Sequence, residues 1–244
     1  MQSTWTRERV EELARDRRFG YQRIELPYGL ATRGKDRSPT APLVLPDDLS
    51  GRSFLDVGCR HGYYCFEALA RGAARAVGLD IAKGAVEAAR LLADCRGDVA
   101  RFDCLDVAAQ RIDETFDYVI CLNVLHHTSD PIAALDNLMA AARETLVLEI
   151  PGFGRRHQRR SGISALEALL IRRTPVIYIA KDQRHPTRKL PKTLITRAAY
   201  LRMLSERRNG FASVEERRSA RRDRHILIAR RAAPAVAGTP GADR

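Results

Sequence analysis

The sequence predicts an α/β fold, a doubly wound and mainly parallel seven-stranded sheet that ends in an antiparallel hairpin. Two observations carry this prediction. Between residues 53 and 150, short apolar runs alternate with amphipathic runs, and strands that alternate with helices form a parallel sheet with helices on both faces. Farther along, residues 211–218 and 224–230 are two extended runs joined by a short charged turn. Such a pair predicts the hairpin.

Each predicted element has its own signal in the pattern of apolar residues. Strands are expected at residues 53–57, 75–80, 98–103, 116–122 and 145–150. Helices are expected between them, at residues 63–71, 83–95 and 131–143. The last of these helices follows Ser129-Asp130-Pro131, which supplies a polar cap and a proline in the first turn.

Outside the alternating region, the predicted elements are fewer. The pattern predicts an amphipathic helix over residues 3–18, a short strand over 175–179 and a further helix over 193–208. Ser164 and Glu167 have the spacing of a capping box before a run of leucines. Residues 19–50, punctuated by proline and glycine, form a connector.

The most informative segment ends the first expected strand. Residues 54–64 read FLDVGCRHGYY, so the strand is followed by a glycine-containing turn and then a helix. Glycines at such a turn let the backbone approach a ligand closely. The second strand ends in Asp80, where an acid can accept hydrogen bonds from both hydroxyls of a ribose. Turn and acid together predict a nucleotide-type ligand.

The glycine spacing indicates which ligand this is. A dinucleotide site uses G-x-G-x-x-G, whereas this chain has Gly58-x-x-x-Gly62, with Arg60 where a middle glycine would fall. Asp56 precedes Gly58 by two residues. Its carboxylate would repel a pyrophosphate but attract an ammonium group. The expected cofactor is therefore a nucleoside with a positively charged amino-acid tail.

These motifs resemble those of a known family. DVGCRHG followed by GLD resembles the first two motifs of class I S-adenosylmethionine-dependent methyltransferases. ELPYGLATRG and FDYVICLNVLHHTSDP are similar to the branch of tRNA wobble-uridine (mo5U34) methyltransferase-like proteins. The resemblance covers roughly residues 21–151 and is stronger for the superfamily than for the substrate, because many members of this branch act on small molecules or glycans.

The resemblance implies S-adenosyl-L-methionine as the cofactor and assigns residues to it. Asp80 would bind the ribose hydroxyls and Ile81 would pack on the adenine. Asp106 would accept from the adenine amino group, with Asp103 as the competing choice. Tyr63 packs either near the cofactor or on the sheet as an ordinary helix residue. The full expected cofactor set is Asp56, Gly58, Cys59, Arg60, Gly62, Tyr63, Asp80, Ile81, Asp106 and Asn123.

Two histidines, His126 and His127, follow Asn123 at the end of the fourth expected strand. Neutral imidazole is well suited to take a proton near pH 7, so either is a candidate general base. Adjacent side chains diverge, and we expect at most one to face the acceptor. The alternative is that one packs and the other caps the loop before the next helix. His127 matches a recurrent histidine of the branch.

His126 marks a departure from the tRNA-modifying members of this branch. Those members transfer a carboxymethyl group and hold its carboxylate with a tyrosine and a lysine. Here the tyrosine position is His126, and SPTAPL before Val44 offers no matching lysine. The resemblance therefore implies ordinary S-adenosylmethionine rather than its carboxylated relative.

Charge is divided unevenly along the chain. Residues 1–150 hold 19 Lys/Arg and 23 Asp/Glu, whereas residues 151–244 hold 23 and 7. The basic third indicates an anionic substrate or partner, unless an arginine-rich composition alone explains it. Its densest run could hold a phosphate or carboxylate, or could be a solvated loop. The expected substrate residues there are Tyr178, Lys181, Arg184 and His185.

The expected organisation is one domain with additions. Residues 1–50 would cover the cofactor site, 51–231 would form the methyltransferase domain with a substrate-binding insertion at about 152–192, and 232–244 would be a disordered tail. Five cysteines without a C-x-x-C pair indicate buried reduced thiols and no metal. No apolar stretch approaches the ~20 residues of a membrane span. We expect a cytoplasmic protein without a membrane partner.

These inferences lead to one expected function and two alternatives. The first is methyl transfer from S-adenosylmethionine to a small molecule, anionic or carrying a sugar or nucleoside, as in natural-product or glycan biosynthesis. The second is modification of RNA, with the basic third following phosphates, although no RNA-binding module and few aromatics accompany the arginines. The third is a non-catalytic binding protein that kept the cofactor fold.

Overall fold

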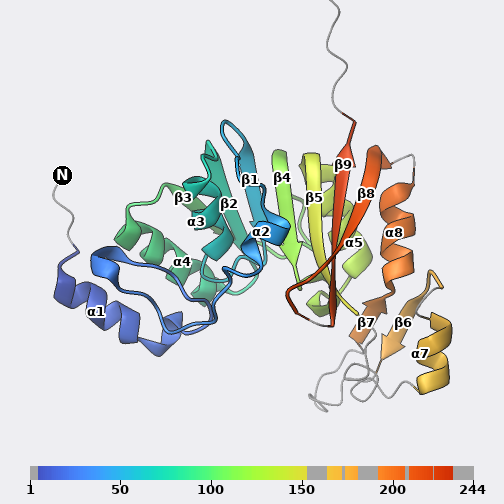
Figure 1. Ribbon diagram of the computed structural model, residues 1–244, viewed down its shortest axis with the longest axis horizontal. Helices are drawn as coiled ribbons and strands as arrows, with labels where there is room; N and C mark the ends of the chain where they lie inside the picture. The colour runs from blue at the N-terminus through green and yellow to red at the C-terminus, as the bar shows by residue number, and fades with distance from the viewer. Residues whose placement is uncertain are drawn as a thin grey trace, which may run out of the picture.

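The structure is a computed structural model, and it describes residues 5–152, 164–171, 174–180, 192–206, 209–221 and 223–232. Within these ranges, a seven-stranded sheet has the order β3-β2-β1-β4-β5-β9-β8 (Figure 1). Its strands are β1 (Ser53–Val57), β2 (Arg75–Asp80), β3 (Ala100–Cys104), β4 (Phe116–Leu122), β5 (Ala142–Pro151), β8 (Phe211–Arg218) and β9 (Arg224–Arg231).

The first five strands in the chain are parallel, and β9 and β8 close the sheet as an antiparallel hairpin. The predicted fold class is confirmed, including the terminal hairpin. Asp56 of β1 is in register with Gly78 of β2 and with Ile120 of β4. The carboxyl ends of these strands therefore meet at one edge of the sheet, where ligands bind in open α/β folds.

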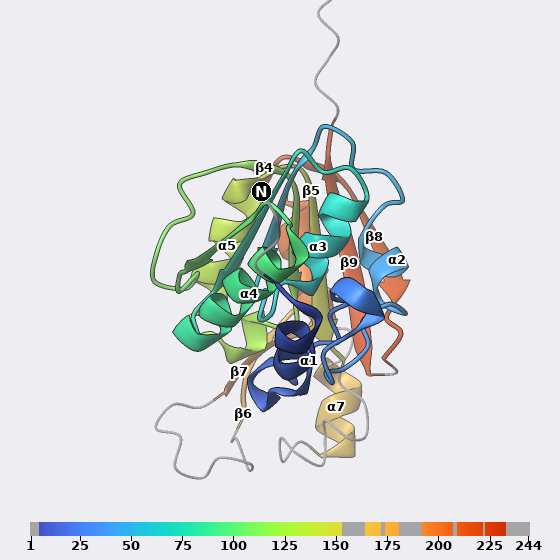
Figure 2. The ribbon, with the colours of Figure 1, turned by 90° about the vertical axis from the view of Figure 1, so that its left-hand side faces the viewer.

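Helices cover both faces of the sheet, as Figure 2 shows for α3 and α5 on opposite sides. The α-helices are α1 (Arg7–Arg15), α2 (Ala41–Val44), α3 (Tyr63–Ala70), α4 (Lys83–Arg96), α5 (Pro131–Ala141), α7 (Ala165–Ile171) and α8 (Arg197–Ser205). Short 3-10 helices are η1 (Arg17–Phe19), η2 (Pro27–Gly29) and η3 (Leu125–His127).

Two hydrophobic clusters lie on the two sides of the sheet. Along β1, Phe54 belongs to the cluster that includes α3 and α4, and Leu55 to the one that includes α5 and α8. Along β9, Ile226 and Leu227 divide in the same way. Strands buried on both faces are continuous apolar runs, which is why the central strands were predictable from the sequence.

Two predicted helix starts are confirmed. Asp130 caps α5, since its carboxylate accepts from the backbone amides of Ile132 and Ala133 at 3.0 Å each. At α7, the Ser164 hydroxyl accepts from Glu167 N at 3.2 Å and the Glu167 carboxylate accepts from Ser164 N at 2.8 Å. This reciprocal pair is a capping box.

The expected helix over 193–208 is wrong at its start. Lys192–Ile195 is instead strand β7, antiparallel to β6 (Ile177–Ala180), and α8 begins only at Arg197. Two features explain the difference. β-branched residues favour extended backbone, and the Thr196 hydroxyl accepts from Ala199 N at 3.2 Å, which fixes the helix start one residue after the strand.

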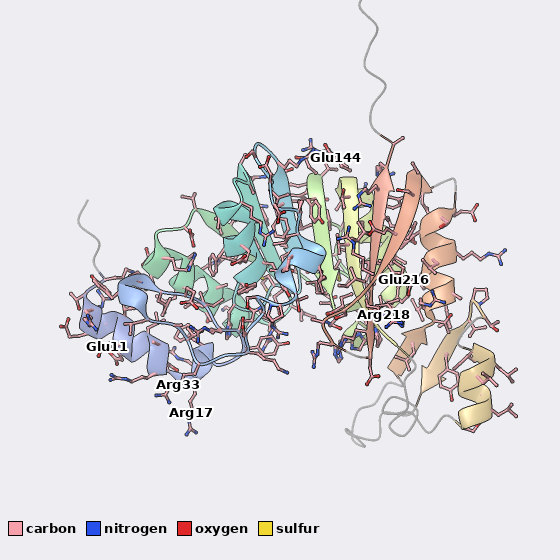
Figure 3. The ribbon with its side chains drawn as sticks, viewed as in Figure 1. Glu11, Arg17, Arg33, Glu144, Glu216 and Arg218 are labelled. Atoms are coloured by element: carbon pink, nitrogen blue, oxygen red, sulfur yellow. The ribbon has the colours of Figure 1, made fainter. Side chains whose placement is uncertain are left out.

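The N-terminal segment and the small β6–β7 sheet both lie along the lower edge of the main sheet in Figure 1. Trp5 Nε1 donates to the Asp94 carboxylate of α4 at 2.9 Å, and His61 N donates to Gln22 Oε1 at 2.9 Å. Arg17 and Arg33 point outward from this segment (Figure 3). The connector is therefore held against the carboxyl edge by buried contacts while its outer side is charged.

Several expectations concern other parts of the chain. Lys181, Arg184, His185 and the tail from residue 233 onward lie outside the described residues. Of the five cysteines, Cys104 is exposed, contrary to the expectation of buried thiols, and the other four are buried. Cys104 ends β3, an outer strand of the sheet. Across the described ranges, no helix is long and apolar enough to cross a membrane.

Candidate functional site

A cavity of about 600 Å³ opens at the carboxyl edge of the sheet. Its walls come from the ends of β1, β2, β4 and β5, from the N-terminal connector, from β7 and from the start of β9. Most sequence-predicted residues line it: Asp56, Gly58, Arg60, Asp80, Ile81, Asp106, Asn123, His126 and His127. Cys59, Gly62 and Tyr63 do not, and neither does Tyr178.

The turn after β1 is held close to its neighbours by glycine. Gly58 and Gly62 have φ of +84° and +85°, a region that L side chains rarely adopt. A Cβ at Gly58 would overlap a methyl group of Val124, and one at Gly62 would lie 2.6 Å from the Phe102 ring. Arg60, between them, also has a positive φ, +52°. The turn can therefore pass directly under a ligand.

Asp80 is a fixed acceptor at the end of β2. It is 6% exposed, and its two carboxylate oxygens accept from Arg60 N at 3.0 Å and Ala82 N at 2.9 Å. Each oxygen keeps a second lone pair. Since Asp80 lines the cavity, it can accept two further hydrogen bonds from neighbouring hydroxyls.

Asp56 is the least satisfied acid of the site. It is 2% exposed, and within the described residues its Oδ2 has no hydrogen-bond partner. Burial, together with the negative charge of Asp80, raises the pKa of Asp56 to about 8. A cation in the cavity would offset both effects. The residues present therefore fit a cofactor with a positively charged end.

The adenine-side candidates are now separated by position. Asp106 lines the cavity, and its Oδ1 accepts from Ala108 N at 2.9 Å. Asp103 forms ion pairs with Arg90 and Arg101 and is not among the lining residues. Ile81 lines the cavity with 65% of its surface exposed, so its side chain is available to a flat ring.

The aromatic residue at the start of α3 is the neighbour of the expected one. Tyr64 lines the cavity and is 6% exposed. Burial and the negative charge of Asp56 raise its pKa. Tyr63 packs edge-on against Tyr64, with ring centroids 5.1 Å apart. Adjacent helix positions point in directions about 100° apart, so the cavity receives only one of the two.

Asn123 belongs to a polar group at the ends of β4 and β5. Its φ is +65°, its side-chain amide donates to the Glu149 carboxylate, and its backbone N donates to Glu149 O at 2.9 Å. The Ser219 hydroxyl also donates to the Glu149 carboxylate. Glu149 is 4% exposed, so this group is fixed from three segments far apart in the sequence.

The two histidines lie in η3, which follows β4. Their ring centroids are 4.1 Å apart, with the planes tilted by 41°. His126 is 8% exposed, and His127 is exposed at the cavity wall. His127 is therefore the more accessible of the two to a molecule in the cavity.

Sequence reasoning missed the basic and polar residues at the far end of the cavity, and the N-terminal ones beside the turn. These are Tyr21, Gln22, Arg37, Thr40, Glu149, Thr193, Arg221 and Arg224. Glu149 had a signal, because an acid near the end of a strand resembles Asp56 and Asp80. Arg37 and Arg224 had none, since they lie in charged segments without a motif.

Comparison with known proteins agrees with a cofactor site in this cavity. Residues 55–145 match the family model described as methyltransferase domain, and these residues carry β1 to β4 with the turn, Asp80 and Asn123. Residues 55–145 therefore form a methyltransferase domain of the class I S-adenosylmethionine-dependent type. Both the predicted family and its cofactor chemistry thus agree with the motifs from which they were inferred.

Curated relatives match a little over a third of the chain. The tRNA U34 carboxymethyltransferase of Campylobacter hominis is 34% identical over 95 residues, 38% of this chain and 33% of the relative. The ubiquinone biosynthesis O-methyltransferase of Neisseria meningitidis serogroup C is 38% identical over 90 residues, 35% of this chain and 37% of the relative. The matches span about a third of the length of these relatives.

Solved methyltransferase structures share the fold over more of the chain. Magnesium protoporphyrin IX methyltransferase from Synechocystis PCC 6803, with bound S-adenosylhomocysteine, is 25% identical, with a TM-score of 0.57, and covers 80% of this chain and 81% of its own. The N-terminal domain of EvdMO1, also with S-adenosylhomocysteine bound, is 17% identical, with a TM-score of 0.68, over 95% and 100%.

Proposed function

We propose that this methyltransferase transfers a methyl group from S-adenosylmethionine to a small-molecule acceptor bound in the same cavity. The observation that carries the proposal is Asp56, a buried carboxylate with an unpartnered oxygen and a pKa of about 8, beside the fixed acceptor Asp80. A ligand with a positive charge and paired hydroxyls suits both acids. S-adenosylmethionine supplies these features and an activated methyl group.

Different residues of the cavity bind different parts of the cofactor. Asp80 accepts from the ribose hydroxyls through its free lone pairs, and Asp106 accepts from the adenine amino group while Ile81 packs on the ring. Asp56 neutralises the ammonium end. Glycines in the turn keep side chains out of the way. Positioning of this kind is most of what methyl transfer requires, because the leaving group is already good.

The acceptor needs its proton removed when it is a hydroxyl or an amine. His127, exposed at the cavity wall, is our candidate base, with His126 packed against it. General bases contribute roughly 10²–10⁴-fold to such steps. Asn123 and Glu149, hydrogen-bonded to each other, line the same cavity.

A small acceptor is supported by the enclosure of the site. Its volume of about 600 Å³ lies within the roughly 300–1,000 Å³ usual for small-molecule sites. It is walled by the connector and by β7 as well as by the sheet. Two similar proteins are likewise named for small molecules, a ubiquinone biosynthesis O-methyltransferase and a magnesium protoporphyrin IX methyltransferase.

RNA remains the second candidate, on one observation. Curated relatives that match about two fifths of the chain are tRNA U34 carboxymethyltransferases. On that reading the basic third would bind phosphates, and binding would weaken steeply with salt.

An assay of labelled methyl transfer distinguishes a small-molecule acceptor from an RNA acceptor. The wild-type protein is supplied with S-adenosylmethionine labelled in the methyl group and with two acceptor pools, a small-molecule extract and total tRNA. We expect label in the small-molecule pool, and loss of it in the Asp80→Ala variant. Label in tRNA alone would replace the proposal with the RNA reading. Transfer from carboxy-S-adenosylmethionine only would contradict the choice of donor.

A further inference from the structure

One end of the cavity collects arginines from opposite ends of the chain. Arg37 comes from the N-terminal connector, Arg221 from the turn before β9, and Arg224 is the first residue of β9. Arg224 is paired in register with Pro151, just beyond Glu149. The fold therefore brings the start of β9 to the carboxyl edge of the parallel strands, next to the connector that lies along this edge (Figure 1).

Two of these guanidinium groups have buried nitrogens without a partner. Within the described part of the chain, Arg37 Nε and Arg224 Nη1 are buried and make no hydrogen bond. Guanidinium groups are seldom buried without acceptors, because each unmade bond to a charged group costs roughly 1–3 kcal/mol or more. Both side chains line the cavity, so a ligand there can supply the missing acceptors.

The electrostatic surroundings point the same way. The pKa of Arg224 is lowered, first by its burial and then by the positive charges of Arg221 and Arg37, while Glu149 opposes this effect. Glu149 already accepts from Asn123 and Ser219. The three arginines therefore outnumber the buried Glu149 here, and the charge of Arg37 also acts on Asp56, whose pKa it lowers.

The Tyr21 ring holds two arginines in place, one from the connector and one from the turn after β1. The guanidinium of Arg37 lies 5.4 Å from the Tyr21 ring centroid and that of Arg60 lies 4.6 Å from it. A planar guanidinium held on an aromatic face keeps its edge nitrogens free to bond outward. The planar fork of arginine matches carboxylate and phosphate oxygens.

We propose that the methyl acceptor carries an oxyanion, a carboxylate or a phosphate, which binds between Arg37 and Arg224 with Arg221 at the mouth of the cavity. This inference rests on the proposed function and names its substrate class. The acids near β1 and β2 bind the cationic cofactor, and the arginines near β9 bind the anionic acceptor. Opposite charges at the two ends thereby orient both molecules for transfer.

The first test measures anion binding to the cofactor-loaded protein. Inorganic phosphate and acetate are titrated into protein saturated with S-adenosylhomocysteine, for wild type, Arg37→Gln, Arg224→Gln and the control Arg33→Gln. Arg33 loses the same charge but points outward from the N-terminal segment (Figure 3). We expect at least one anion to bind the wild type and the control equally, and to bind the two cavity variants about tenfold or more weakly.

Equal binding by all four proteins, or no binding by the wild type, would overturn the proposal. Affinity for S-adenosylhomocysteine is measured in the same experiment. If every protein failed to bind it, the proposed function would fail as well. If it bound while the anion did not, only the oxyanion inference would fall. Arg37→Lys and Arg224→Lys keep the charge without the fork and should recover part of the anion affinity.

The second test asks whether the anion belongs to the acceptor or to the donor. Carboxy-S-adenosylmethionine and S-adenosylmethionine are titrated into wild type and Arg224→Gln without acceptor. We expect Arg224→Gln to change the affinities for the two donors equally. Selective loss of the carboxylated donor would assign the arginines to the donor and contradict the acceptor role.

Discussion

The two ends of the cavity are built in different ways. Asp56, Gly58 and Asp80, at the cofactor end, lie within 25 residues of sequence and are held by backbone amides and tight glycines. At the acceptor end, Glu149 and Arg224 come from β5 and β9, and Arg37, whose charge acts on both Asp56 and Arg224, comes from the connector. A site used for one common ligand can be local in sequence, whereas one that selects a substrate can draw on any segment the fold brings near.

The two ends of the cavity also differ in charge. At the cofactor end, the buried Asp56 has an oxygen without a donor, and at the other end the half-buried Arg37 and Arg224 each have a buried nitrogen without an acceptor, as Arg60 Nε also does in the turn after β1. Either arrangement is costly in the absence of a ligand of opposite sign. Variants that affect one end only should therefore leave binding at the other unchanged, and this separation is what the following predictions test.

The largest effect should come from Asp80→Ala. This variant removes both acceptors for the ribose hydroxyls, and two charge-assisted hydrogen bonds correspond to roughly 100-fold or more in affinity. Isothermal titration with S-adenosylhomocysteine measures it. Asp103→Ala serves as the control, because Asp103 forms only outward ion pairs near the same strands. Equal loss in both variants, or none in Asp80→Ala, would remove Asp80 from the site.

Gly62→Ala should destabilise the fold by about 2 kcal/mol or more. The new methyl group would lie 2.6 Å from the Phe102 ring at a φ of +85°, which combines overpacking with backbone strain. Gly97→Ala, at φ +75° with nothing within 4 Å, isolates the backbone cost of about 1 kcal/mol. Urea denaturation gives both values. Equal losses of stability in the two variants would show that the close contact between Gly62 and the Phe102 ring does not contribute to the stability of the fold.

The pH dependence of cofactor binding should follow the ionisation of the Asp56 carboxyl group. The pKa of Asp56 in the folded protein is about 8, whereas in the unfolded chain the carboxyl loses its proton near pH 4. Between these two pH values only the folded protein holds the proton, so the stability that Asp56 contributes falls as the pH rises toward 8. A cationic ligand favours the carboxylate. Affinity should therefore rise by up to tenfold per pH unit between about pH 6 and 8, with release of a proton.

Asp56→Asn should abolish this dependence, since the amide does not titrate. Titration of S-adenosylhomocysteine at several pH values, in buffers of different ionisation enthalpy, detects the released proton directly. A wild-type affinity that stays flat from about pH 6 to 8 would show that Asp56 does not meet the charged end of the cofactor.

The smallest effect should come from Ser219→Ala at the acceptor end. The lost hydroxyl leaves one oxygen of the Glu149 carboxylate without its donor, a change of about 1 kcal/mol. We expect an increase of several-fold in the KM for acceptor and no change in the affinity for S-adenosylhomocysteine. A matched loss of cofactor affinity would mean that the two ends of the cavity are coupled rather than separate.

Much of the fold followed from the sequence, because its elements have local causes. Phe54 to Asp56 is an apolar run ended by an acid, and Asp130-Pro131 is a helix start with its own cap. The short β6–β7 sheet did not follow, because a run such as Leu194-Ile195 suits a helix or a strand equally, and its partner strand decides between them.

In the candidate site, too, only the residues with a local sequence signal were predictable. Asp56 and Asp80 were expected at the site because a strand end is a local signal, and both line the cavity; the roles that the family resemblance implies for them stay a prediction. Tyr64 was missed by one residue, since helix phase decides which of two adjacent tyrosines faces the cavity. Arg37 and Arg224 were missed because only the order of β5 and β9 in the sheet, with the path of the connector, brings them together.

The measurement that tests the account most directly is calorimetric titration of the wild-type protein with S-adenosylhomocysteine, followed by inorganic phosphate. The account predicts micromolar binding of the first and then binding of the second without displacement, since acids bind one and arginines the other. If S-adenosylhomocysteine failed to bind, or if phosphate displaced it, the cavity would not contain two separate ends of opposite charge.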